Sequence, residues 1–430
     1  MKILIKGGRV IDPANNVDKV TDIFVDNGVI SDIGDDLELE GIDMEVIDAS
    51  GKIVSPGLVD MHCHLRDPGQ EYKEDIETGT RSAAVGGITS IACMPNTKPV
   101  IDSEAVVSYI RNRAKEVGYV NVYPIGAVSK GLEGKELAEI GELKFAGAVA
   151  ISDDGHPVVS SGLMRRAMEY ADMFDMTVIS HCEDLGLADG GHMNEGYMST
   201  YLGLRGITRA AEEVMVSRDI IIAEATGTAI HIAHVSTRGS VELVRQAKKR
   251  GVRVTCETCP HYFTLTEKAV DGFNTNAKMN PPLRTDDDVE AIKEGLKDGT
   301  IDCIVTDHAP HHIDEKNCEF ALALNGIVGF ETSLGLGLEY LVKPGVLTLN
   351  ELIEKMSVNP SRILGLSKGK LSVGGCADIT IFNPDKEWTV DISKFESKSK
   401  NSPYDGFKLC GKPEYVIVNG DIIVNQGVLL

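Results

Sequence analysis

Two histidines stand two positions apart in the stretch DMHCHLRDPG, residues 60–69, and an arginine follows two positions later. Alternate side chains of an extended strand face the same side, so His62, His64 and Arg66 would share one face. Two neighbouring imidazoles can hold a metal ion, and a guanidinium beside them suits an anionic group. Taken alone, the stretch also fits a strand end whose two histidines bind no metal.

These histidines belong to a pattern that repeats eight times: an apolar strand, a polar residue at its C-terminal end, and an amphipathic helical stretch. The predicted strands are 52–64, 89–96, 121–128, 147–154, 177–184, 229–236, 252–261 and 302–311. Strands buried on both faces with helices between them predict a (β/α)8 barrel. An open doubly wound sheet is the alternative, but no glycine-rich phosphate loop follows its first strand.

In such a barrel the C-terminal ends of the strands meet at one rim, where the chemistry takes place. The predicted ends carry His62, His64, Asn96, Asp153, Asp154, His181, His234 and Asp307. Imidazole and carboxylate ligands without thiolate suit zinc, with manganese or cobalt as substitutes. Six ligands exceed the needs of one catalytic zinc, so we predict two ions that share a carboxylate from the fourth strand. The other predicted ligands are His62, His64 and Asp307 for one ion, and His181 and His234 for the second.

The fourth strand offers two neighbouring carboxylates for the shared position. Alternation turns only one of Asp153 and Asp154 toward the barrel axis, and the pattern does not choose between them. Asp307 is predicted to lie at a metal and to face the pocket, where it can accept and return protons.

Both ends of the chain differ from its middle. They consist of short alternating strands with Gly, Asn and Asp turns, and Asn419-Gly420 is a strong hairpin signal. We predict that residues 1–52 and 366–430 together form a small β-sandwich domain, and that residues 53–365 form the metal-binding barrel.

The composition limits the partners. The 430 residues include 65 acidic and 43 basic side chains, a net charge of −22, so neither nucleic acid nor an anionic membrane is an expected partner. A leader and a long apolar run are absent from the sequence, and most of the nine cysteines stand alone in apolar strands, which predicts a cytoplasmic protein with free thiols. The lone pair Cys256 and Cys259 has no second pair, which disfavours a structural zinc or a redox role.

Seven segments, taken as a set, resemble the motifs of class I (bacterial-type) dihydroorotases in the amidohydrolase superfamily. They are PGLVDMHCHLRDPG, ACMPNTKP, SDDG, SHCED, IAHVST, MNPPLR and TDHAPH. The resemblance implies a binuclear zinc enzyme that interconverts (S)-dihydroorotate and N-carbamoyl-L-aspartate in de novo pyrimidine (UMP) biosynthesis. It implies Asp154 as the shared ligand and Asp307 as the acid and base. We also expect a homodimer and a complex with aspartate transcarbamoylase.

The resemblance further implies a set of substrate contacts, several of them to the ring carboxylate. They are His64, Arg66, Asn96, Asn280, His311, Asn325 and Gly326. Relatives often carry an aromatic residue where this chain has Asn325, a departure that matters little for a contact through the backbone.

Two alternatives remain at this point. A hydantoinase, dihydropyrimidinase or allantoinase would share the barrel, but many such enzymes bridge their metals with a carboxylated lysine, and no lysine lies between positions 145 and 180. A non-catalytic homologue that serves as an assembly partner would typically have lost ligands, and all six are present.

Overall fold

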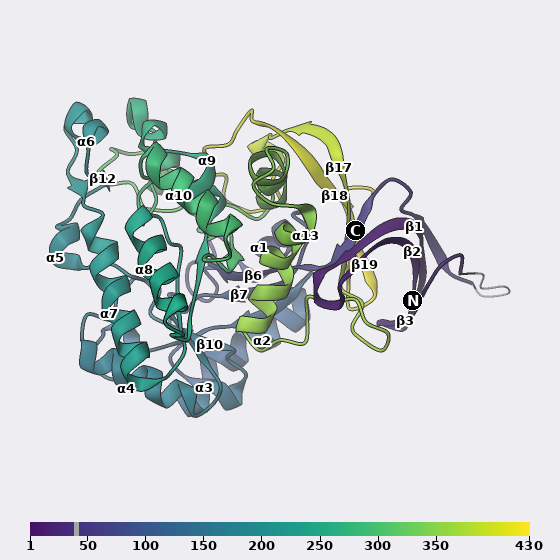
Figure 1. Cartoon of the computed structure of the whole chain (residues 1–430), viewed down its shortest axis with the longest axis horizontal. Helices are drawn as coiled ribbons and strands as arrows, with labels where there is room; N and C mark the ends of the chain where they lie inside the picture. The colour runs from purple at the N-terminus through teal and green to yellow at the C-terminus, as the bar shows by residue number, and fades with distance from the viewer. Residues whose placement is uncertain (38–42) are drawn as a thin grey trace.

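The computed structural model describes residues 1–37 and 43–430 and contains a barrel and a β domain (Figure 1). Residues 38–42, which fall within the predicted N-terminal β segment, lie outside the described part of the chain. Both termini lie in the β domain (Figure 1). Among the described helices, none has the length and apolar character needed to cross a membrane.

Eight parallel strand positions form the barrel in chain order. They are β6 (Leu58–Cys63), β7 (Ile88–Cys93), β8 (Asn121–Pro124) continued by β9 (Gly126–Ala127), β10 (Ala150–Ser152), β11 (Thr177–Ser180), β14 (Ile230–Ile232), β15 (Val254–Thr258) and β16 (Cys303–Ile304). The third position is split, because β8 pairs with β7 whereas β9 pairs with β10. The ring closes beyond β16, where the backbone N–H of His64 donates to the His308 carbonyl at 2.8 Å. The predicted (β/α)8 barrel is confirmed.

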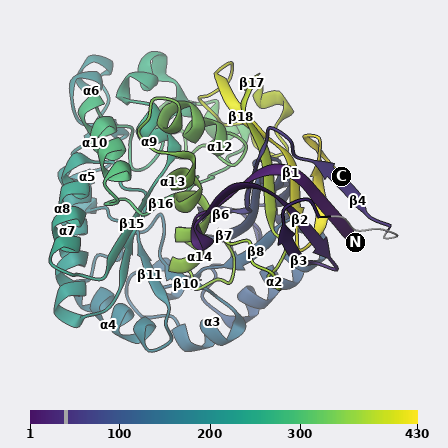
Figure 2. The same ribbon diagram turned by 45° about the vertical axis from the view of Figure 1, so that its right-hand side comes forward.

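Helices cover the outside of the barrel (Figure 2). The longer ones are α1 (Ile76–Val85), α2 (Glu104–Val117), α3 (Ile140–Ala146), α4 (Ser161–Asp172), α7 (Ala210–Thr226), α8 (Arg238–Lys249) and α10 (Asp286–Lys297). Shorter ones are α5 (Leu185–Ala188), α6 (Tyr197–Leu202), α9 (Pro260–Thr264), α11 (Ile313–Lys316), α12 (Ser333–Gly337), α13 (Leu349–Ile353) and α14 (Asn359–Ile363). Apolar spacing sets their inner faces: in α8, Val241 and Val244 are buried, and Thr237 caps the first turn by accepting from the Ser240 N–H.

The β domain is one nine-stranded sheet built from both ends of the chain. Its strands are β1 (Lys2–Asp12), β2 (Val17–Asp26), β3 (Val29–Gly34), β4 (Glu45–Asp48), β5 (Ile53–Pro56), β17 (Ile379–Thr389), β18 (Lys408–Val418), β19 (Asp421–Asn425) and β20 (Val428–Leu429). Strand β5 joins the two halves, since it pairs with β1 on one side and β17 on the other. Alternate residues such as Ile3, Ile5, Ile379 and Ile381 form a shared core. A separate two-stranded sheet pairs β12 (Met193–Asn194) with β13 (Gly206–Ile207).

Two segments differ from the predicted domain boundaries. Residues 53–56, predicted to begin the barrel, form β5 of the β domain, and the barrel begins after Gly57. The turn there requires glycine, because a Cβ at Gly57 would lie 2.1 Å from the Thr89 hydroxyl. Residues 396–401, predicted to belong to the β domain, lie against the barrel instead, because buried carboxylates of the barrel such as Glu74 accept their N–H and O–H groups.

Candidate metal centre and substrate pocket

Four imidazoles surround one carboxylate at the C-terminal rim of the barrel. Asp154 Oδ1 lies 3.4 Å from Nε2 of both His62 and His234, and 3.7 Å from His181 Nδ1. Asp154 Oδ2 lies 3.4 Å from His64 Nε2. The five residues follow or end four different barrel strands, and all are buried. The predicted convergence of these side chains is therefore present in the structure.

Asp153 points away from this centre. Its Oδ1 accepts from the backbone N–H groups of Val128 and Ser129 at 2.8 and 3.0 Å. Strand alternation did not show which of the two aspartates faces the barrel axis. In the structure the loop after β9 binds Asp153, and Asp154 faces the histidines.

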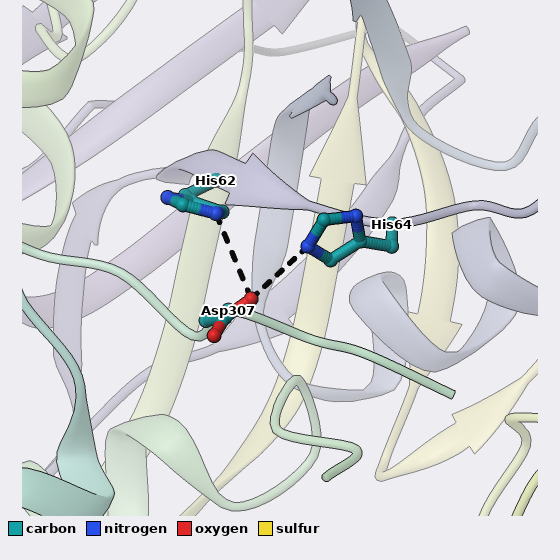
Figure 3. Close-up of side chains that lie close together, drawn as sticks. All are labelled: His62, His64 and Asp307. Carbon is teal, nitrogen blue, oxygen red and sulfur yellow. Dashed lines mark hydrogen bonds and ion pairs between the residues drawn. The ribbon is translucent and has the colours of Figure 1, made fainter. Parts of the chain in front are cut away.

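Asp307, from the end of the last strand, completes the centre (Figure 3). Its Oδ1 lies 3.1 Å from His64 Nε2 and 3.6 Å from His62 Nε2. Among the described residues, three groups have ligand atoms that all lie within 4.8 Å of one another: His62, His64 and Asp307; His62, Asp154 and His234; and Cys259, His261 and Asp307. The first group is the predicted ligand set of one ion. In the second group His62 takes the place predicted for His181, whose Nδ1 lies 2.9 Å from His234 Nε2.

The donor set fits divalent metal ions. Among the described residues, neither His62 Nε2 nor Asp154 Oδ1 has a hydrogen-bond partner, although both are buried. Buried polar atoms are normally bonded, so this pair points to a missing electrophile between them. Metal–ligand bonds of ~2.1 Å would place neighbouring tetrahedral ligands about 3.4 Å apart, which is the spacing found around Asp154.

Outer hydrogen bonds turn the histidine lone pairs toward the centre. His62 Nδ1 lies 2.5 Å from Glu257 Oε1, and His64 Nδ1 lies 2.9 Å from Asn96 Oδ1. Because these oxygens can only accept, each Nδ1 carries the proton and each Nε2 presents its lone pair inward. The second Glu257 oxygen accepts from His231 Nε2 at 3.1 Å.

Glu257 was not identified from the sequence. The available signal was an acidic residue inside the apolar strand 252–261, where a buried carboxylate needs a partner. For Asn96 the sequence predicted a substrate contact. The hydrogen bond by which Asn96 orients His64 was not predicted.

The two central carboxylates are ionised. Burial opposes this, but His62 and His234 hold the pKa of Asp154 well below its usual range. Burial likewise opposes ionisation of Asp307, and His64 and His62 lower its pKa. At neutral pH both therefore carry the negative charge that a cation needs, and Asp307 has the form that can accept a proton.

A cavity of about 330 Å³ opens beside this centre. Every predicted substrate contact lines it: His64, Arg66, Asn96, Asn280, His311, Asn325 and Gly326. Arg66 is buried, donates through Nε to the Pro310 carbonyl at 3.2 Å, and forms no ion pair with a described residue. Burial lowers the pKa of Arg66, yet a guanidinium remains charged, so the cavity holds a cation that has no salt-bridge partner among the described residues.

The other predicted substrate contacts differ in the hydrogen bonds that they already make within the protein. Asn280 donates through Nδ2 to Glu183 Oε2 at 3.2 Å, and His311 donates through Nε2 to the Asn325 carbonyl at 2.7 Å. His311 Nδ1 has no hydrogen-bond partner among the described residues. His156 is exposed and lines the same cavity.

Two other polar side chains are buried. His261, in α9, packs against Tyr262, and one of its ring nitrogens lies within 4.8 Å of an Asp307 oxygen. Arg284 donates to Asn194 Oδ1 and the Ile207 carbonyl.

Backbone strain is concentrated at this site. Arg66, His234 and Asp307 have φ angles of 61°, 33° and 45°, in the left-handed region that L residues rarely adopt. Each such residue costs roughly 1–3 kcal/mol and persists where its surroundings fix it. The sharp turn after each strand aims the following side chain into the rim, which links the strain to the position of these groups.

Comparisons with known proteins agree with this geometry. The family described as "Dihydro-orotase-like" matches residues 51–240. A dihydroorotase of Acetivibrio thermocellus is 67% identical over 428 residues, and one of Ruminiclostridium cellulolyticum is 64% identical over 430 residues, each covering 100% of both chains. Among solved structures, an L-hydantoinase (dihydropyrimidinase) from Arthrobacter aurescens has a TM-score of 0.90 and 29% identity, covering 100% of this chain and 97% of its own.

Proposed function

This chain belongs to the dihydroorotase family, and we propose that its rim pocket interconverts (S)-dihydroorotate and N-carbamoyl-L-aspartate in pyrimidine biosynthesis. One observation carries the proposal: the unpaired guanidinium of Arg66 lies in the same cavity as the histidine and aspartate centre. Dihydroorotate unites the two matching groups, a cyclic amide for the centre and a carboxylate for a guanidinium.

We assign two divalent ions to the centre, with zinc as the native metal and manganese or cobalt as substitutes. His62, His64 and Asp307 would hold one ion, His181 and His234 the other, and Asp154 would contact both. Such ions supply Lewis-acid activation of a water and of the substrate carbonyl at neutral pH. The imidazole and carboxylate donors and the orphaned atoms of His62 and Asp154 support this assignment.

The side chains perform the proton transfers and the positioning. Arg66 holds the ring carboxylate, and Asn96 and Asn280 line the cavity with amide groups, so that the ring amide faces Asp307. As the water oxygen bonds to the carbonyl carbon, the Asp307 carboxylate accepts its proton. When the carbon–nitrogen bond breaks, Asp307 returns that proton to the departing ring nitrogen. Ring closure uses the same steps in reverse.

Substitution of Arg66 by alanine tests the carboxylate assignment. We expect the KM for dihydroorotate to rise roughly 10- to 100-fold, since a hydrogen bond to a charged group is worth about 1.5–3 kcal/mol. Because the contact exists before and during the reaction, kcat should change much less. Steady-state ring-opening kinetics measure both values, and an Arg66→Ala variant with wild-type KM would refute the role.

A related cyclic-amide hydrolase acting on a neutral ring is the second candidate, favoured by the likeness to the hydantoinase structure. The fourth strand argues against it, because it supplies Asp154 and no lysine at the centre. Turnover of dihydroorotate and of an uncharged hydantoin by the same preparation separates the two. Faster turnover of the hydantoin would replace the proposed substrate.

The oligomeric state, the cellular compartment and a protein partner are also proposed. We propose a homodimer in the cytoplasm, where the nine free cysteines suit a reducing compartment. We further propose a complex with aspartate transcarbamoylase, whose product is the substrate of ring closure. Ring-closure assays of the purified protein, alone and with that transferase added, test the partner, and light scattering tests the dimer.

A further inference from the structure

One wall of the pocket is a loop whose backbone carbonyl groups are bound almost entirely by side chains. Residues 320–326, here called the wall loop, belong to none of the described helices or strands, and Leu324, Asn325 and Gly326 line the cavity. Six of the seven carbonyl oxygens of the wall loop accept hydrogen bonds from side chains. The donors are Lys278, Lys316, His311 and Asn401.

Two buried lysines supply most of these bonds. Lys278 Nζ donates to the carbonyls of Phe320, Ala321 and Ala323 at 2.7, 3.0 and 2.7 Å. Lys316 Nζ donates to Leu324, Gly326 and the Lys278 carbonyl at 2.7, 3.1 and 3.3 Å. An ammonium has three N–H donors, so each lysine uses all of them on backbone.

Neither ammonium has a carboxylate counterion among the described residues, although both lysines are more than nine-tenths buried. Removing an unpaired ammonium from water is strongly unfavourable unless its surroundings fix and solvate it. Burial and the neighbouring Lys278 lower the pKa of Lys316 to about 7, which reflects that cost. Buried groups that cost this much free energy are typical of positions where function requires a fixed backbone geometry.

The two lysines differ in what they hold. The carbonyls bound by Lys278 belong to residues outside the cavity lining, whereas Lys316 binds Leu324 and Gly326, which line it. Position 326 requires glycine: its φ is 127°, and a Cβ there would lie 2.6 Å from the Ala309 Cβ and 3.3 Å from His311 Nε2.

We propose that Lys316 is a positioning residue for the substrate: its ammonium fixes the 324–326 backbone in the conformation that meets the ligand, while Lys278 anchors the outer half of the wall loop. Besides burial, Arg66 and, in its protonated form, Lys316 lower the pKa of His311, so both cations contribute positive charge at this cavity-lining ring. In a chain of net charge −22 this concentrates positive potential at the end of the pocket that receives an anion. The inference rests on the proposed function, because it concerns recognition of dihydroorotate.

The test compares Lys316→Met with Lys278→Met, which each remove three donors and shorten the unbranched side chain by only one atom. We expect Lys316→Met to raise the KM for dihydroorotate about tenfold or more, with kcat within about threefold of wild type. Lys278→Met should lower the melting temperature to a similar extent but leave KM within about threefold. Lys316→Gln, which keeps two donors, replaces the methionine variant if that variant does not fold.

Two outcomes would overturn the inference: a folded Lys316 variant with wild-type KM, or equal rises in KM for the Lys316 and Lys278 variants, which would indicate loop stability alone. Failure of the proposed function is a different result. It would show as a wild-type protein, loaded with zinc, that does not open dihydroorotate.

Discussion

At the residue scale, two roles are proposed for Asp307, metal binding and proton transfer, and one substitution can separate them. Its Oδ1 lies within 3.6 Å of both His62 and His64, and the carboxylate lines the cavity. Asp307→Asn keeps an oxygen ligand but removes the proton acceptor. We expect kcat to fall by roughly 10²- to 10⁴-fold, the usual contribution of general acid and base catalysis.

The kcat of Asp307→Asn is interpreted together with the metal content of the same sample, measured by elemental analysis. A variant that retains both metals and more than a tenth of wild-type kcat would contradict the acid and base assignment. A variant that loses metal as well as activity is compared again after reloading with zinc.

Glu257 carries a second prediction at this scale. It accepts from His62 Nδ1 and His231 Nε2, and His231 Nδ1 in turn contacts the Thr255 hydroxyl. Glu257→Gln keeps an acceptor for His62 but removes the buried negative charge. We expect the affinity for zinc to fall about 10- to 100-fold, as is usual for partners of metal-binding histidines.

Competition with a chromophoric chelator measures that affinity without reference to activity. Thr255→Val is the matched control, because it perturbs the same chain one step further from the metal and should have a smaller effect. Wild-type zinc affinity in folded Glu257→Gln would show that Glu257 does not support the ligand.

At the element scale, residues 396 and 397, far along the chain, are bound to the barrel by the partly buried side chain of Glu331. Glu331 Oε1 accepts from the Ser82 hydroxyl at 2.8 Å and from the N–H groups of Glu396 and Ser397 at 2.8 and 3.3 Å. Burial raises the pKa of Glu331 to about 7. In the folded protein this carboxyl therefore stays protonated well above the pH at which it ionises in an unfolded chain.

The raised pKa of Glu331 sets the direction in which the free energy of unfolding changes with pH. An unfolded glutamate titrates near pH ~4.3, so between there and about pH 7 the folded state binds the extra proton and stability falls as pH rises. Glu331→Gln mimics the neutral acid and removes this loss. Relative to wild type, the variant should gain on the order of 3 kcal/mol in free energy of unfolding between pH 4.5 and pH 8.

Chemical denaturation at several pH values checks this, with Glu396→Gln, whose side chain is partly exposed, as the control. Parallel stability curves for wild type and Glu331→Gln would show that Glu331 is ionised in the folded protein and that its pKa is not raised.

Elements were predictable where their pattern is local. Apolar spacing predicted amphipathic helices between the strands, such as α4 and α8 in the structure, and the eight apolar strands located the barrel positions, because each pattern reports burial of its own segment. The end of β5 was not predictable: residues 52–64 read as one apolar run, and the exchange of sheets at Gly57 depends on the side chain of Thr89, which is distant in sequence.

At the scale of the whole molecule, the convergence of the predicted metal ligands could be foreseen from the sequence, and the residues that support them less so. Strand ends converge in any barrel, so His62, His64, His181, His234 and Asp307 could be grouped without a structure. Asn401 could not be found in this way. It reaches the pocket wall from the segment between β17 and β18, where it accepts from the His311 N–H and donates to the Gly326 carbonyl.

The central claim concerns a pair of divalent ions and one reaction, so one measurement addresses both: metal content and dihydroorotate ring opening, followed on the same sample during chelation and reloading. The account predicts about two divalent ions per chain, loss of ring opening as they are removed, and its return when zinc is added. A sample free of bound metal that still opens dihydroorotate at the wild-type rate would contradict it.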